Sequence, residues 1–178
     1  MMFWRSSEPR TGYDAIVVGA GAHGLATAYY LVQRHGMTDV AVLDQRAVLS
    51  PAASAFARGA AARGVDLIPD CEATGILMHR RRVAGVETTR GCIEAPRVAL
   101  ATGGHTSALT DMAGLRLPLD GLFIDCGWGT GGLEAASAVG WVYAEAIATG
   151  ALIEQHAVRP SPTEERASRL PSESGRAS

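Results

Sequence analysis

The sequence predicts an α/β fold with a central parallel sheet, flanking helices and an antiparallel β-meander. Three observations predict it. Short apolar, β-branched runs alternate with helical patterns before Cys71, a glycine-rich turn joins the first strand to the first helix, and closely spaced β-runs follow Cys71. Strands alternating with helices are typical of a parallel sheet, whereas strands separated by short polar turns are typical of an antiparallel one.

Length and composition predict one buried domain. The chain has 178 residues, of which 47% are hydrophobic and 19% charged, as is usual for a globular α/β domain. Residues 1–12 read as a flexible leader and residues 13–156 as the folded domain. Residues 157–178, rich in Pro, Ser, Glu and Arg, read as a disordered tail because they offer few apolar groups to bury.

Charge and cysteine usage predict a cytoplasmic protein. The formal net charge of -2 gives no general attraction to nucleic acid or to an acidic membrane surface. Cys71, Cys92 and Cys126 form no C-x-x-C pattern, so we expect free thiols in a reducing compartment and no metal site. No apolar run approaches the length of a membrane span or a signal-peptide core.

The first strand and turn form a dinucleotide-binding fingerprint. The apolar run 13–18 predicts a buried strand, and G-A-G-A-H-G over residues 19–24 follows it as G-x-G-x-x-G. Gly19 allows a sharp turn out of the strand, Gly21 lets a pyrophosphate approach the backbone, and Gly24 lets the helix pack tightly. The phosphates would face the unpaired N–H groups at the start of that helix.

The next segment completes a Rossmann-like β-α-β unit. Apolar residues recur at helical spacing from Leu25 to Val32, Gly36 is a candidate left-handed cap, and the apolar run 40–43 predicts a second strand that ends in Asp44. A carboxylate at this place is suited to hold ribose hydroxyls. Gln45 and Arg46 are candidates for contacts with the ribose or phosphates, and a solvated surface position is the alternative.

The middle of the chain predicts a second crossover and then the meander. Ser50 and Pro51 favour the start of a helix over residues 52–63, which Gly64 would cap. Residues 65–68 predict a third parallel strand. The three β-rich runs that follow cover residues 71–78, 83–89 and 92–100, and the apolar end of the last run favours its return to the main sheet.

Two further small-residue turns are expected at the carboxyl edge of the sheet. The first covers residues 101–104 and is followed by His105, which is a candidate general base or a helix-start residue. The second covers residues 127–132, between a strand over 121–126 and a helix over about 134–149. Its glycines expose N–H groups suited to a negative or polarised oxygen, although a flexible turn is the alternative reading.

Several of these motifs resemble a known family. The strand and helix over residues 13–31, the G-V-E-T-T-R-G run over 85–91 and the G-W-G-T-G-G run over 127–132 are similar to the beta subunit of heterotetrameric sarcosine oxidase. That subunit belongs to the D-amino-acid oxidase group of FAD-dependent oxidoreductases. The chain lacks blocks that members of this family have, including the antiparallel sheet of the substrate domain near residues 120–122.

The resemblance implies a non-covalent FAD site. It implies that Gly19, Gly21 and Gly24 bind the pyrophosphate, Asp44 binds the ribose, and Ala73 contacts the adenine through its backbone. The segment 127–132 would approach the flavin ring near its C2 carbonyl oxygen. The full set of expected cofactor residues is Gly19, Ala20, Gly21, His23, Gly24, Asp44, Gln45, Arg46, Ala73, Ala101, Thr102, Gly103, Gly127, Trp128, Gly129, Thr130, Gly131 and Gly132.

Three functions remain open at this point. The first is an enzyme that oxidises a small secondary amine or amino acid, such as sarcosine, by hydride transfer to FAD, with partner subunits of a hetero-oligomer. The second is a non-catalytic or partner-dependent FAD-binding module, which the missing blocks favour. The third is an NAD(P)-binding Rossmann domain, which leaves the 127–132 segment unexplained. No catalytic acid or base is assigned.

Overall fold

A computed structural model describes residues 7–46, 53–80, 82–102, 120–125 and 132–150. The expected disordered tail, His105, Gly103 and residues 127–131 lie outside this part of the chain. The described elements, in chain order, are β1 (Ala15–Val18), α1 (Ala22–His35), β2 (Val40–Leu43), α2 (Ser54–Ala61), β3 (Asp66–Ile68), β4 (Ala73–His79), β5 (Arg82–Thr88), β6 (Gly91–Glu94), β7 (Val98–Leu100), β8 (Leu122–Ile124) and α4 (Gly132–Thr149).

The described strands form two sheets. The main sheet has five strands in the order β3-β2-β1-β7-β8, and all of its pairings are parallel. The second sheet has three strands in the order β4-β5-β6, paired antiparallel. This arrangement, with helices flanking the parallel sheet, confirms the predicted fold class.

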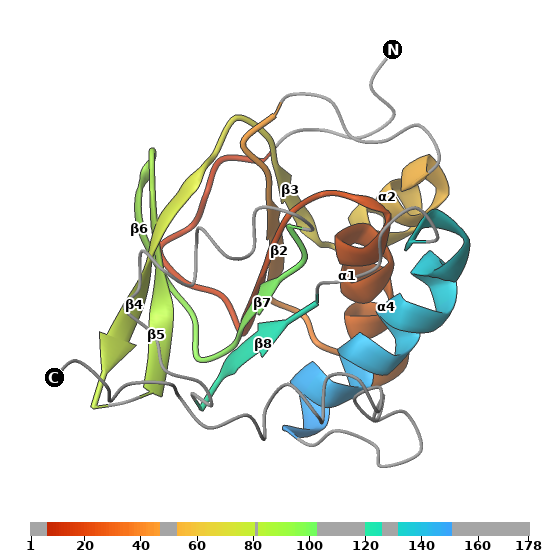
Figure 1. Ribbon diagram of the computed structural model, residues 1–178. Helices are drawn as coiled ribbons and strands as arrows, with labels where there is room; N and C mark the ends of the chain where they lie inside the picture. Colours follow the sequence, from red (N-terminus) through yellow and green to blue (C-terminus); the bar gives the residue numbers. More distant parts are fainter. Residues whose placement is uncertain (1–6, 47–52, 81, 103–119, 126–131, 151–178) are drawn as a thin grey trace, which may run out of the picture.

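The parallel sheet is covered on both faces (Figure 1). Ala15 and Val17 of β1 belong to the core cluster that includes the residues of α1, α2 and α4. Ile16 and Val18 belong to the second cluster, which includes Val86 of β5 and other residues of the antiparallel sheet. Successive side chains of a strand point to opposite faces, so a strand buried on both faces has no polar positions. This is why β1 and β2 are uninterrupted apolar runs.

Helices α1 and α4 pack directly against each other on the helical face (Figure 1). They approach closely at Gly140, where a Cβ atom would overlap the Cβ of Ala26. Helix α1 ends as expected at Gly36, which has a left-handed φ of 64°. In the described part of the chain, no helix combines the length and apolarity needed to cross a membrane.

The apolar end of the run 92–100 returns to the main sheet as β7, as expected. Pro96, which has no N–H to continue a ladder, lies between β6 and β7. The end of the expected flexible leader is held in place: the Ser7 N–H donates to the Leu67 carbonyl at 3.0 Å. Arg10 also lies 2.7 Å from Asp39 and 2.9 Å from Asp66.

Candidate functional site

The carboxyl ends of the parallel strands bring residues from distant parts of the chain to one edge of the sheet. The residue after each strand continues the hydrogen bonding of the sheet, so these residues lie side by side in the order Asp44, Gly19, Ala101, Asp125. The bonds run from Asp44 N–H to Ile68 O (3.1 Å), Gly19 N–H to Leu43 O (2.8 Å), Ala101 N–H to Val18 O (2.8 Å) and Asp125 N–H to Leu100 O (2.9 Å). Open α/β sheets bind ligands at this edge.

The three glycines of the turn after β1 have different surroundings. Gly19 has a φ of 108°, and a Cβ there would lie 2.5 Å from the carbonyl oxygen of Ala101. A Cβ at Gly24 would overlap the carbonyl oxygen of Gly19, so α1 packs directly on the turn. A Cβ at Gly21 would meet no atom within 4 Å. Gly19 and Gly24 are therefore required by the fold itself, whereas the absence of a side chain at Gly21 leaves open space beside the backbone.

Asp44 is fixed next to this turn. Its Oδ2 accepts a hydrogen bond from the Ala20 N–H at 2.7 Å, and its Oδ1 accepts one from the Arg46 N–H at 2.8 Å. Each carboxylate oxygen can accept more than one hydrogen bond, so capacity for further donors remains. Gln45 and Arg46 are exposed. Asp44 therefore lies at the end of β2, and its side chain is oriented by the glycine turn that contains Gly21.

A histidine–carboxylate pair joins the fingerprint to the end of β8. His23 Nδ1 lies 2.7 Å from Asp125 Oδ2, and the two side chains are only 13% and 6% exposed. The residues are 102 positions apart in the sequence. Asp125 lies two positions before the second glycine-rich segment in the sequence. The pair therefore joins the end of β8 to the first turn of α1, a contact that the sequence did not predict.

Helices α1 and α4 run in the same direction and begin at the same end. Gly140 packs against Ala26, the Arg34 guanidinium lies 4.8 Å from the Trp141 ring centroid, and His35 Nε2 lies 3.5 Å from Glu145 Oε2 (Figure 1). The numbers rise together along both helices, so the helices are parallel. Since α1 begins at the glycine turn, α4, which begins at Gly132, also starts near the carboxyl edge of the sheet. The positive ends of two helix dipoles thus lie at this edge.

The structure also describes three further residues of the expected cofactor site, Ala101, Thr102 and Ala73. Ala101 lies against Gly19, and Thr102 continues from it at the same edge. Ala73, at the start of β4, is 8% exposed and follows Cys71, whose N–H donates to the Asp44 carbonyl at 2.9 Å.

Among the residues that the structure describes, no group of His, Cys, Asp and Glu could hold a metal ion.

Comparison with known proteins identifies the family to which this edge belongs. The family model described as FAD dependent oxidoreductase matches residues 14–57 and 47–122. The chain belongs to the FAD-dependent oxidoreductase family. This membership confirms the expected cofactor class, FAD, and disfavours the NAD(P) alternative. It also agrees with the sequence resemblance to the D-amino-acid oxidase group.

The chain is similar to curated proteins that are named as sarcosine oxidase subunits and sarcosine dehydrogenases. It is 28% identical to sarcosine oxidase subunit beta of Arthrobacter sp, over 65% of this chain and 57% of the relative. It is 45% identical to mitochondrial sarcosine dehydrogenase of Homo sapiens, over 36% of this chain and 8% of the relative. The chain thus spans just over half the length of the sarcosine oxidase beta subunits that it matches.

Solved structures share the fold. L-Amino acid deaminase from Proteus myxofaciens superposes with a TM-score of 0.55 at 16% identity, covering 65% of this chain and 52% of that chain. L-Proline dehydrogenase from P. horikoshii gives 0.54 at 14% identity, covering 62% and 58%. Glycine oxidase from Bacillus cereus gives 0.51 at 15% identity, covering 56% and 57%. These neighbours confirm the Rossmann-type architecture.

Proposed function

We propose that the chain forms the FAD-binding part of an oxidoreductase that oxidises a secondary amine or amino acid, such as sarcosine, by hydride transfer to the flavin. The observation that carries the proposal is the convergence at one sheet edge of the open glycine turn, Asp44 and the His23–Asp125 pair. Family membership and the sarcosine oxidase relatives support the same chemistry.

The residues at the edge fit an FAD molecule. The space beside Gly21 lets a pyrophosphate reach the N–H groups at the start of α1, where the helix dipole favours negative charge. Asp44 has the acceptor capacity to hold the adenosine ribose. Ala73 presents a small side chain at the start of β4, which leaves its backbone as the contact for an adenine. From Ala73 through Asp44 to Gly21, the assigned residues follow the order of adenine, ribose and pyrophosphate in the cofactor.

The flavin end is assigned to the segment after Asp125. The bound flavin would supply the electron sink for amine oxidation. The protein's task at this end is to orient the cofactor and to place donors where negative charge develops. The His23–Asp125 pair joins the residue that follows β8 to the first turn of α1, beside the turn that would hold the pyrophosphate.

A partner-dependent FAD-binding module is the second candidate. The alignment with the Arthrobacter subunit extends over 231 positions although it includes only 65% of this chain, so the relative carries intervening segments that this sequence lacks. That relative is named as a subunit, which favours a hetero-oligomeric assembly with partner subunits. In this case the cavity that receives a small amine would be completed by another chain.

Anaerobic reduction separates the two candidates. The purified chain is loaded with FAD, freed of excess cofactor and mixed with sarcosine without oxygen. Bleaching of the flavin absorbance is expected for the competent enzyme. A flavin that stays oxidised with sarcosine and with proline, but is bleached by dithionite, supports the module. A chain that takes up NADH and no FAD contradicts both.

A further inference from the structure

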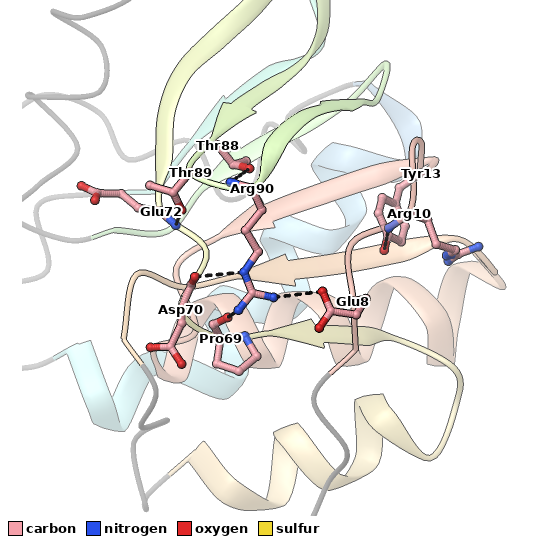
Figure 2. A network of polar contacts seen from close by, with 9 residues as sticks. All are labelled: Glu8, Arg10, Tyr13, Pro69, Asp70, Glu72, Thr88, Thr89 and Arg90. Carbon is pink, nitrogen blue, oxygen red and sulfur yellow. Dashed lines mark hydrogen bonds and ion pairs between the residues drawn. The ribbon is translucent and has the colours of Figure 1, made fainter.

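Arg90 lies at the turn between β5 and β6 and is in contact with a distant part of the fold (Figure 2). Its Nε donates to the Asp70 carbonyl at 3.2 Å, and its Nη2 donates to the Pro69 carbonyl at 3.1 Å. Its Nη1 lies 3.3 Å from Glu8 Oε2. One guanidinium thus holds two successive backbone carbonyls of the connection from β3 to β4.

The two hydrogen bonds from Arg90 to backbone carbonyls contribute more interaction energy than the ion pair with Glu8. The Arg90 side chain is 31% exposed, whereas the Glu8 side chain is 90% exposed. An ion pair to so exposed a partner contributes little, because water and salt screen it. Hydrogen bonds from a charged donor to carbonyls are stronger, and the bond to the Pro69 carbonyl is partly buried. Arg90 therefore acts on the backbone of residues 69–70.

The arginine is itself held in position by its own turn. The Thr89 N–H donates to the Glu72 carbonyl at 3.0 Å, and the Glu72 N–H donates to Thr89 Oγ1 at 3.2 Å. The Arg90 N–H donates to Thr88 Oγ1 at 3.0 Å. Because these bonds fix the turn against the start of β4, the guanidinium has little freedom relative to the connection that it contacts.

The held segment lies between two groups assigned to the adenosine half of the cofactor. Asp70 has a φ of 51°, a left-handed conformation that non-glycine residues seldom adopt. The next residue, Cys71, donates its N–H to the Asp44 carbonyl at 2.9 Å, and Ala73 follows two positions later. The path from Asp44 to Ala73 thus passes through a sharp turn whose carbonyls Arg90 holds.

We propose that Arg90 is a positioning residue for the adenosine end of the FAD site: it holds residues 69–70 so that Asp44 and Ala73 keep the spacing that ribose and adenine require. The inference rests on the proposed function. It gives Arg90, which lies in a polar turn between two β-rich runs of the sequence, a role in cofactor affinity without contact with the cofactor.

The test compares Arg90→Gln, Arg90→Lys and the matched control Glu8→Gln. FAD affinity is measured by titration of flavin fluorescence, and hydrogen exchange is followed in the peptide covering residues 69–73. Arg90→Gln is expected to raise the Kd for FAD by about ten-fold, the effect of losing charge-assisted hydrogen bonds. It is also expected to speed exchange at the Cys71 amide while leaving β1 protected. Arg90→Lys should recover part of both effects, and Glu8→Gln should match the parent.

The outcomes separate this inference from the proposed function. If the parent binds FAD and Arg90→Gln binds it equally well, the inference is wrong and the proposed function stands. A lower melting temperature for Arg90→Gln with unchanged FAD affinity would assign the residue a purely structural role, which also overturns the inference. If Arg90→Gln does not fold, Arg90→Lys decides between these results. If the parent protein binds no FAD, both the inference and the proposed function are wrong.

Discussion

Replacing Gly21 with alanine adds a single methyl group, and it tests FAD binding separately from the stability of the fold. The residue has φ −72° and ψ −178°, which any amino acid adopts, and its Cβ would meet no atom within 4 Å. Gly21 is the N-cap of α1, a position where alanine is poorer than glycine. The free energy of unfolding of the FAD-free chain should therefore fall by at most about 1 kcal/mol.

The effect on FAD should be much larger. The methyl group would occupy the open space through which the pyrophosphate reaches the backbone N–H groups. Losing two charge-assisted hydrogen bonds, each contributing about 1.5 to 3 kcal/mol, lowers the affinity by about 100-fold or more. Melting curves of the FAD-free protein and titration with FAD measure the two quantities on the same sample.

Gly36→Ala is the matched control. Gly36 has a φ of 64° and also has nothing within 4 Å of its Cβ position. Alanine there should cost about 1 kcal/mol of stability because of the left-handed backbone, with no change in FAD affinity. If Gly21→Ala binds FAD with the Kd of the parent, the assignment of the pyrophosphate to this turn is wrong.

Three further changes test the packing around the site. Gly24→Ala should destabilise the chain by several kcal/mol, about 3 or more, because the new Cβ would overlap backbone; chemical denaturation measures this. Asp125→Ala should cost about 1 to 3 kcal/mol and weaken FAD binding, because it removes the partner of His23 in a buried pair. Burial raises the pKa of Tyr13 above 10.0. Stability should therefore be full below pH 10 and fall as the pH rises through the folded-state pKa, and Tyr13→Phe should weaken this dependence.

Each of these changes has a result that would contradict it. A stability of Gly24→Ala equal to that of the parent would mean that α1 does not rest on the glycine turn. Asp125→Asn keeps an acceptor oxygen and should behave better than Asp125→Ala; equal losses would show that the contact with His23 does not matter. A pH profile of stability that is identical in Tyr13→Phe and the parent would exclude the Tyr13 hydroxyl as its source.

The sequence could predict the elements that depend on local patterns. Doubly buried strands are uninterrupted apolar runs, and the parallel pairing follows from the helices between them, so the β-α-β units were predictable. Gly36 was also predictable, because a left-handed cap requires a residue without a Cβ. The turn over 19–24 and the acid at the end of β2 were recognisable because their spacing in the sequence is fixed.

Contacts between distant residues could not be predicted in the same way. No local pattern indicates that His23 contacts Asp125, which is 102 positions away. Arg90 lies in a polar turn and gave no sign that its guanidinium holds the carbonyls of Pro69 and Asp70. Arg10 likewise has partners that only the folded chain brings near it.

The stoichiometry of bound FAD tests the central claim most directly. The purified chain is incubated with excess FAD, desalted, and analysed for flavin absorbance and protein concentration. The account predicts one FAD per chain, released as unmodified FAD when the protein is denatured. A folded, colourless chain that retains no FAD after this treatment would contradict it.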